Sequence, residues 1–365
     1  MKKYCLFAQA LMLTDIATAS SSINTINDSV KFSIIEERHY SIRQASSLDN
    51  AEQYINWLID TGQIKDIYDQ KISQNTYVIF DIDETLLHIT SANFSAKYFE
   101  EATSVFEQYK ENNKCDDKKM NRIHKIIYEQ MPEALVDNRF PAFINKLQAS
   151  GVKTIAISAI HNIDLNGTKL LDIRFNKLKQ LGIDFSKSYP DLPPCNISKK
   201  FDIHYSSGII SSGSSNKGSA FTKFYNHYAK NARNMKKTCH DSTIIGNLTA
   251  PRQIIFLDDI CYNINSIGEL YTHNKINYVG IYYTACDALT FVAPYNAKTL
   301  YYQIKIADKK SLFVNDNEVV DYLCQQFLLP ITSIRKRIFK EFLKKLNPTI
   351  EMTSTFDTNE TDNSK

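Results

Sequence analysis

The feature that most limits how this chain can fold is the run Tyr77-Val78-Ile79-Phe80, followed at once by Asp81 and Asp83. A short run of β-branched and aromatic residues is typical of a strand that is buried on both faces inside a parallel sheet. Such sheets bind ligands in the crevice beyond the carboxyl ends of their strands. The sequence therefore predicts that Asp81 lies on that edge and that Asp83 turns toward the same crevice. Two carboxylates placed there can serve as a nucleophile and a proton donor.

Three further segments follow in order along the chain. Residues 154–158 form a second apolar run that ends in a hydroxyl residue, and residues 253–257 form a third run that ends in two aspartates. Between them, a lysine precedes a glycine and a helical pattern. An asparagine follows the third run. The chemistry-bearing residues at these positions are Ser158, Lys217, Asp258, Asp259 and Asn263.

Taken together, these segments resemble the four ordered signatures of the haloacid dehalogenase-like superfamily, beginning with DxDxT at 81–85. The resemblance covers about residues 75–283, and the chain looks closest to exported bacterial phosphatase-like members. It implies an α/β fold with a doubly wound parallel sheet and a small helical cap inserted after the first core strand. Alternation of strand and helix patterns along the chain independently favours a doubly wound sheet.

The resemblance also implies a role for each matched residue. Asp81 would attack phosphorus and form an aspartyl-phosphate, and Asp83 would protonate the leaving alcohol and then activate water. Ser158 and Lys217 would bind the phosphoryl group. Mg²⁺ would be held by Asp81, the backbone carbonyl of Asp83, and the side chains of Asp258 and Asp259. The two residues expected to support the site are Thr85 and Asn263.

The expected function is magnesium-dependent hydrolysis of a phosphomonoester, with a phosphorylated small molecule as substrate. Two alternatives stay open: a phosphotransferase or phosphomutase that uses the same residues, and an exported interaction protein on the same scaffold with weak or no catalysis. A calcium-binding EF-hand starting at Asp81 is excluded, because Leu86 and Ala92 stand where Gly and Glu are required. A P-loop at 213–219 is excluded because Gly218 precedes Ser219 where that motif needs lysine.

Charge and composition narrow the compartment and the partners. The formal net charge is only +3 and basic residues are scattered, so nucleic-acid binding is not expected. Lys2-Lys3, an apolar segment at 4–13 and Ala17-Thr18-Ala19 indicate a signal peptide at 1–19 and export to the periplasm or medium. No later segment is long and apolar enough to cross a bilayer. The protein partner, if there is one, is unknown.

The chain divides into a linker with helices at 20–74, a core at 75–90 and 136–300, a two-helix cap at 91–135, C-terminal helices at 301–352 and a disordered tail at 353–365. Within these, the patterns predict helices at 48–59, 141–149 and 168–181, a strand at 277–283, and a hairpin inside the loop 187–215. Cys115 and Cys195, on polar loops, are the disulfide candidates. Cys261 and Cys286 are expected to be buried thiols.

Overall fold

The computed structural model describes residues 40–60, 76–94, 98–238, 251, 253–272, 276–289 and 295–326. The expected signal peptide at 1–19 and the tail at 353–365 lie outside these residues. The chain forms two compact units. One comprises Met1–Thr90 and Glu133–Thr290, and the other comprises Ser91–Pro132 and Phe291–Lys365.

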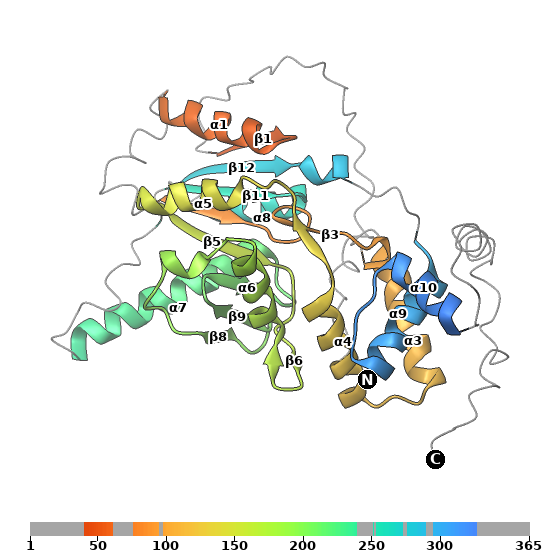
Figure 1. Cartoon of the computed structure of the whole chain (residues 1–365). Helices are drawn as coiled ribbons and strands as arrows, with labels where there is room; N and C mark the ends of the chain where they lie inside the picture. Colours follow the sequence, from red (N-terminus) through yellow and green to blue (C-terminus); the bar gives the residue numbers. More distant parts are fainter. Residues whose placement is uncertain are drawn as a thin grey trace, which may run out of the picture. The chain divides into compact units, whose positions relative to one another are not determined.

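The first unit is an α/β structure on a mainly parallel sheet, which among the described residues has eight strands (Figure 1). Neighbours pair in parallel from β1 across to β10, and the last two pairs, β10 with β9 and β9 with β8, are antiparallel. In order across the sheet, the strands are β1 (Tyr40–Ala45), β12 (Asn277–Tyr283), β11 (Gln253–Asp258), β2 (Thr76–Phe80), β5 (Lys153–Ser158), β10 (Ile209–Ser211), β9 (Ile203–Ser206) and β8 (Cys195–Ser198).

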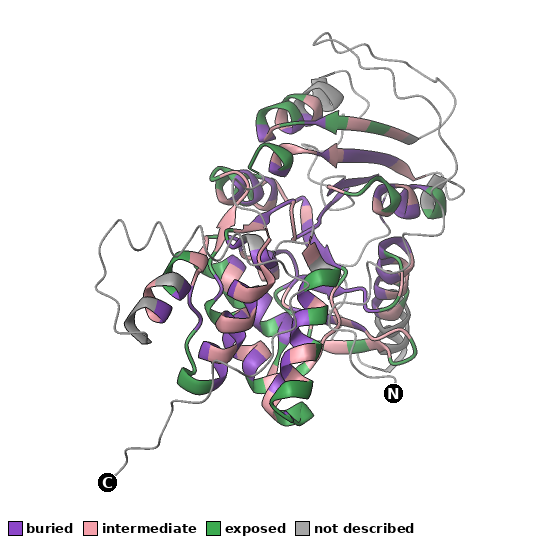
Figure 2. Cartoon of the chain, turned by 90° about the vertical axis from the view of Figure 1, so that its right-hand side faces the viewer, coloured by how far each residue is buried: buried purple, intermediate pink, exposed green. Residues whose placement is uncertain are grey.

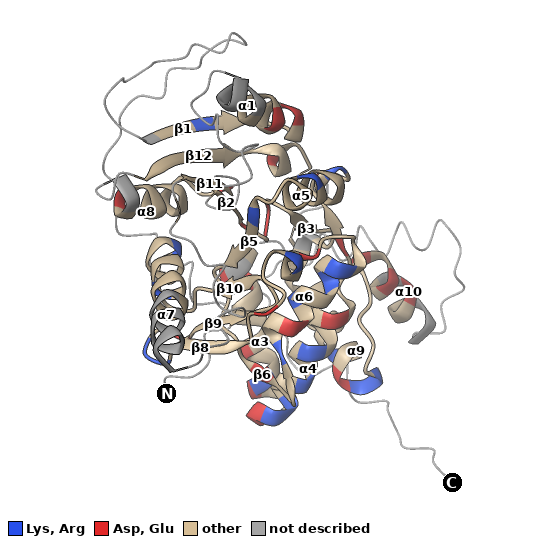
Figure 3. Cartoon of the chain, turned by 90° about the vertical axis from the view of Figure 1, so that its left-hand side faces the viewer, with Lys and Arg blue, Asp and Glu red and all other residues tan. Residues whose placement is uncertain are grey.

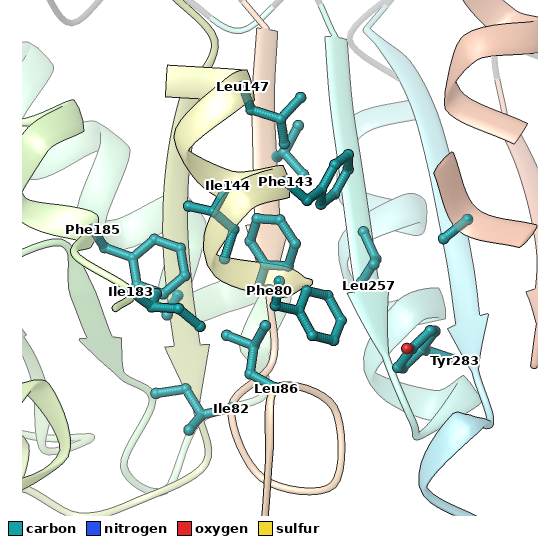
Figure 4. Packing of buried hydrophobic residues seen from close by; sticks show 14 of the residues in the cluster. Phe80, Ile82, Leu86, Phe143, Ile144, Leu147, Ile183, Phe185, Leu257 and Tyr283 are labelled. Atoms are coloured by element: carbon teal, nitrogen blue, oxygen red, sulfur yellow. The ribbon is translucent and has the colours of Figure 1, made fainter. Parts of the chain in front are cut away.

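Helices cover both faces of this sheet, which explains why its inner strands are continuous apolar runs. Val78 and Phe80 of β2 pack in a cluster with α1 (Leu48–Asp60), α5 (Phe140–Ala149) and α6 (Leu170–Gln180). Figure 4 shows Phe80 among the side chains of α5. The alternate residues Tyr77 and Ile79 pack in a second cluster with α7 (Lys217–Thr238) and α8 (Cys261–Thr272). Edge strand β1 is partly exposed, whereas its neighbour β12 is mostly buried (Figure 2).

After β2, the chain first adds strands on one side of β2 and then returns to add strands on the other side. Helices α5 and α6 lead from β2 to β5 and on to β10. Helix α7 then returns the chain to β11, on the other side of β2, and α8 leads on to β12. Neighbouring strands β2 and β11 therefore mark the topological switch point, the place where open parallel sheets bind ligands.

Most of the predicted elements are confirmed, and two strands of the eight-stranded sheet were missed. The structure has the predicted strand at Asn277–Tyr283, the three predicted helices α1, α5 and α6, and a hairpin of β9 and β10. Ser47 caps α1 by accepting a hydrogen bond from the Asn50 amide at 3.2 Å. The linker 20–74 contains strand β1, and the loop 187–215 also contains strand β8.

The second unit combines the inserted helices α3 (Phe99–Asn112) and α4 (Asp117–Gln130) with the later helices α9 (Ala297–Lys310) and α10 (Asp316–Gln326). Helix α9 packs against three others, and its Asp308 carboxylate accepts a hydrogen bond from Tyr109 and pairs with Lys119 and Arg122, each at 2.8 Å. Two helices alone would leave an apolar face exposed, and α9 covers it. This grouping differs from the expected separation of a cap at 91–135 from C-terminal helices at 301–352.

The expected disulfide is absent: in the described part of the chain, Cys115 and Cys195 are free thiols. Cys115 is buried in the connection between α3 and α4, and Cys195 lies 3.2 Å from the Tyr228 hydroxyl, so each thiol is already packed in a different part of the fold. Cys286 is a buried thiol as predicted, whereas Cys261 is exposed on the first turn of α8.

Charge is mixed on the described helices, and their hydropathy agrees with the expectation of no membrane span. In the view of Figure 3, basic and acidic residues are interspersed over α4, α6 and α9. Among the described helices, none combines the length and apolar character needed to cross a membrane.

Candidate functional site

A buried lysine joins two aspartates at the switch point. Asp81 follows β2, its amide donates to the Leu257 carbonyl of β11 at 2.9 Å, and only 4% of the residue is exposed. Lys217, the first residue of α7, places its Nζ 2.5 Å from Asp81 Oδ1 and 2.7 Å from Asp258 Oδ2. The fold thus brings together three of the residues that the sequence singled out, from two strand ends and one helix start.

The charges of this group depend on one another. Burial by itself lowers the pKa of Lys217, but the carboxylates of Asp258 and Asp81 more than offset that effect, so the pKa is raised and the lysine is a cation. Burial raises the pKa of Asp81 well above its usual value; Lys217 opposes this shift, and Asp258 adds to it. The ammonium group of Lys217 favours the ionised form of Asp81, which burial disfavours. Because a buried carboxylate has few water molecules around it, its oxygens are available to act as a nucleophile.

Helix α8 fixes the second aspartate. Asp258 Oδ1 accepts hydrogen bonds from the Ile260 amide at 2.8 Å and from the Asn263 side-chain amide at 3.0 Å. Asn263 is therefore a positioning residue for Asp258. Helices α7 and α8 approach closely behind the site, because a Cβ on Gly218 would lie 2.0 Å from the Ser266 carbonyl oxygen. Only glycine can follow Lys217 here without separating the two helices.

Three carboxylates form the group that could hold a cation. Oxygens of Asp81, Asp258 and Asp259 lie within 4.8 Å of one another. Burial, followed by the neighbouring Asp258, raises the pKa of Asp259 to about 7. Asp259 Oδ1 is buried and has no hydrogen-bond partner in the described part of the chain. An all-oxygen donor set with an unsatisfied carboxylate oxygen fits Mg²⁺.

Asp83 belongs to a second set of contacts, on the side of the sheet that α6 covers. Its Oδ2 accepts a hydrogen bond from Ser158 at 3.2 Å, and its Oδ1 pairs with Arg174 at 2.5 Å. Arg174 also pairs with Glu133 at 2.6 Å, and Lys177 lies 3.4 Å from the same glutamate. The two aspartates of the motif therefore have different partners, Lys217 for Asp81 and Arg174 for Asp83.

Arg174 was missed by sequence reasoning, although a signal was present. It lies on α6 in line with the buried residues Leu171 and Leu178, at helical spacing, and is itself only 5% exposed. Arginine is almost never fully buried unless it is paired. A basic residue within the apolar stripe of a predicted helix therefore indicates a buried acidic partner, here Asp83 and Glu133.

Two buried hydroxyl groups add to the polar edge of the sheet. The Ser212 amide donates to the Ser158 carbonyl at 2.9 Å, which places Ser212 directly beside the end of β5. Ser212 Oγ and Thr85 Oγ1 are buried and have no hydrogen-bond partner among the described residues. Buried hydroxyls are normally satisfied, so a ligand oxygen at this edge would complete them. Thr85 was expected to support the site, whereas Ser212 was missed because serine is common in loops.

Residues 60–235 match a family described as "Protein of unknown function (DUF2608)". No curated protein and no solved structure matches the chain. The matched range includes Asp81, Asp83, Ser158 and Lys217 but ends before Asp258.

This result corrects the assignment to the haloacid dehalogenase-like superfamily and to its exported phosphatase-like members, which is wrong as it stands. The matching family carries no known function, and no match names that superfamily. The signatures were short and widely spaced. Acidic and hydroxyl residues at the ends of parallel strands arise wherever such a sheet binds a ligand, so the pattern does not establish descent.

Proposed function

We propose that this protein is a magnesium-dependent phosphatase that hydrolyses a phosphomonoester through an aspartyl-phosphate intermediate. The observation that carries the proposal is the buried Asp81 carboxylate, 2.5 Å from the Lys217 ammonium group, at the switch point of a parallel sheet. A nucleophile, a fixed cation and a second carboxylate at one sheet edge are the groups that phosphoryl transfer needs. The contacts of these residues support this chemistry without reference to any family.

In the first step, a carboxylate oxygen of Asp81 attacks phosphorus and the bond to the leaving oxygen breaks. Asp83 gives its proton to that leaving oxygen. Lys217 stabilises the negative charge on the phosphoryl oxygens, and Ser158 and Ser212 donate hydrogen bonds to them. Such charge stabilisation is usually the largest single contribution to catalysis.

In the second step, Asp83 takes a proton from water, which attacks phosphorus and releases phosphate and Asp81. Arg174 holds Asp83 in place for both proton transfers. The residues that would hold Mg²⁺ are Asp81, Asp258 and Asp259, with the backbone carbonyl of Asp83 as a further ligand. When bound, the ion would neutralise the phosphate that enters a site of carboxylates.

The inserted helices are proposed to act as a cap that selects the substrate. The chain leaves the sheet along strand β3 (Leu87–Ile89) and returns along β4 (Glu133–Leu135), and these strands pair with each other. Strand β3 begins just after Asp83, and Glu133 of β4 pairs with Arg174. Movement of the inserted segment would therefore be transmitted to Asp83, the proposed proton donor, through the paired strands β3 and β4.

The test is hydrolysis of p-nitrophenyl phosphate by the purified full-length protein, with Mg²⁺ and after exhaustive chelation. We expect turnover that depends on added Mg²⁺, and none in the Asp81→Asn variant, because an amide is a far weaker nucleophile. Analysis of products with an added alcohol separates a phosphatase from a phosphotransferase. Full activity after chelation would contradict the metal, and full activity of Asp81→Asn would contradict the nucleophile.

A further inference from the structure

Two histidines share one aspartate on the same unit as the proposed site. Asp202 Oδ2 lies 2.9 Å from His161 Nδ1, and Asp202 Oδ1 lies 2.8 Å from His204 Nε2. The three side chains are partly open to solvent, with exposed fractions of 22% for His161, 38% for Asp202 and 17% for His204. The proposed mechanism uses none of them.

The strand register places this cluster on the edge of the sheet that carries Ser158. Ser158 of β5 is opposite Ser211 of β10, and Ser211 is opposite His204 of β9. Neighbouring strands lie about 4.8 Å apart, so His204 is about 10 Å from Ser158 and about 14 Å from the end of β2. His161 contacts Asp202 from a different segment, the loop that directly follows Ser158 at the end of β5.

The backbone around Asp202 is firmly held. Asp202 has a left-handed backbone with φ 54°, and its carbonyl accepts a hydrogen bond from Ser211 Oγ at 3.4 Å. The Phe201 carbonyl accepts from the Ser214 amide at 2.9 Å. A Cβ on Gly213 would lie 2.1 Å from that carbonyl oxygen, so glycine is required beneath the cluster.

Basic side chains lie close to the cluster. Burial alone raises the pKa of Asp202, but the hydrogen bonds from His161 and His204 outweigh it, so the pKa is lowered and the carboxylate stays ionised. Next to it, the ammonium groups of Lys200 and Lys223 lie 5.1 and 4.6 Å from the centre of the Phe201 ring. The Asp202 carboxylate thus contacts two imidazoles, and two lysines lie over the ring of the residue that precedes it.

The ring nitrogens that do not face Asp202 are Nε2 of His161 and Nδ1 of His204. A protonated histidine donates hydrogen bonds from both of its ring nitrogens. With Asp202 holding one nitrogen of each ring, the other nitrogen of each would be a charged donor in a fixed position. Fixed, charged donors are the usual means of recognising phosphate and carboxylate groups.

We propose that the His161–Asp202–His204 cluster binds a second anionic group of the substrate, a phosphate or a carboxylate. The preferred substrates would then be phosphomonoesters whose leaving group carries this charge about 10 to 14 Å from the reacting phosphorus. The inference rests on the proposed phosphatase function, because the first phosphate occupies the site of Asp81 and Lys217.

The experiment measures binding, so it does not depend on turnover. Calorimetry with the full-length protein and Mg²⁺ compares α,ω-alkane bisphosphonates of increasing chain length with alkyl monophosphonates of the same length. An α-phosphono-ω-carboxylate series repeats the comparison with a carboxylate as the second anion. We expect either bifunctional probe to bind at least about tenfold more tightly than the monophosphonate when its charges are about 10 to 14 Å apart.

Matched variants separate anion binding from a purely structural role. His161→Asn keeps an N–H near the position of Nδ1, and His204→Gln keeps one near Nε2, so both retain a donor to Asp202 but cannot carry charge. The double variant should lose the advantage of the bifunctional probes while it binds the monophosphonate as the wild type does. Equal loss for all probes would mean that the cluster only holds the loops, and would overturn the inference.

The comparison of probes of increasing chain length uses the wild-type protein, so it tests the inference even if the variants fail to fold. If the monophosphonate binds and neither bifunctional series gains affinity at any length, the second subsite is refuted and the proposed function survives. If no phosphonate binds at all, the proposed function itself fails and the subsite fails with it.

Discussion

At the scale of single residues, the stability of the site depends on Lys217. Its side chain is almost fully buried between Asp81 and Asp258, so it is the cation that compensates two desolvated carboxylates. Removing one partner from a buried ionic group typically costs about 3 to 5 kcal/mol, because the remaining charge is left unpaired. Without Lys217, these carboxylates have to become protonated or repel each other.

We therefore predict that Lys217→Met lowers the free energy of unfolding of the metal-free protein by about 3 to 5 kcal/mol. Added Mg²⁺ should restore part of this loss, because a bound cation replaces the missing charge. Chemical denaturation with and without Mg²⁺ measures both effects, and Lys217→Met combined with Asp81→Asn should be less destabilised than the single variant. An unfolding curve like that of the wild type without metal would disprove the charge balance argued for the site.

A second prediction at this scale concerns Asp83, which Arg174 and Ser158 hold. Asp83→Asn keeps the shape of the side chain but cannot donate a proton as a carboxylic acid. Hydrolysis of an alkyl phosphate should slow by about 10² to 10⁴-fold, the usual contribution of general acid–base catalysis. An aryl phosphate with an acidic leaving group should slow less in the step that breaks its ester bond. If the variant kept more than about a tenth of the wild-type rate on the alkyl phosphate, the assigned role would be wrong.

At the scale of elements, the sequence predicted strands that are buried on both faces and missed strands at the edges. The four residues from Tyr77 to Phe80 are fully buried and read as one apolar run. Strand β1 is only partly buried and mixes polar with apolar residues, and β8 is short, polar and shifted in register. Edge strands carry no continuous apolar run, so their pattern is indistinguishable from a loop.

The same reasoning explains which site residues could be predicted. Asp81, Ser158 and Asp258 end or directly follow inner strands, and their position follows from the rule that parallel strands end at one edge. Arg174 reaches Asp83 from the middle of a helix, and His204 lies on an antiparallel strand added beyond β10. Those contacts depend on how α6 crosses the sheet and on strand pairing, neither of which leaves a local pattern.

A third prediction belongs to helices α3 and α4. The ring of His124 in α4 lies 4.8 Å from that of Phe106 in α3, and its Nδ1 is buried with no hydrogen-bond partner among the described residues. Burial lowers the pKa of His124 to about 4. The folded protein therefore holds this ring neutral, while the unfolded chain takes up a proton below the ordinary value of about 6.5.

Because the unfolded state binds more protons in this window, stability is complete above about pH 6.5 and falls as the pH drops toward 4. The loss reaches up to about 3 kcal/mol. Denaturant titrations between these pH values should show a shallower decline for His124→Leu than for the wild type. Parallel declines would show that the ring is protonated in the folded protein as easily as in the unfolded one.

At the scale of the whole molecule, the second unit is assembled from two distant segments of the chain. Ser91–Pro132 supplies α3 and α4, and Phe291–Lys365 supplies α9 and α10. Besides the ion pairs of Asp308, Asn93 donates to Gln303 Oε1 at 3.3 Å and to Asp316 Oδ1 at 3.1 Å. The inserted helices and the later helices therefore depend on each other for their buried polar contacts as well as their apolar ones.

The last prediction compares two deletions that this arrangement distinguishes. Ile89 of β3 is opposite Glu133 of β4, so a short Gly/Ser turn can join the strands in place of residues 91–132. Deleting only this segment should give an aggregating protein, because α9 loses α3 and α4 and exposes its buried face. Deleting residues 291–365 as well should restore solubility and a cooperative thermal transition, since the sheet and its helices retain both of their own core clusters. The double deletion should also keep magnesium-dependent hydrolysis of p-nitrophenyl phosphate, because the residues proposed for the chemistry all lie in the first unit. Soluble yield, melting temperature and turnover measure the three expectations. A single deletion as soluble and stable as the double deletion would show that α9 and α10 do not need the inserted helices.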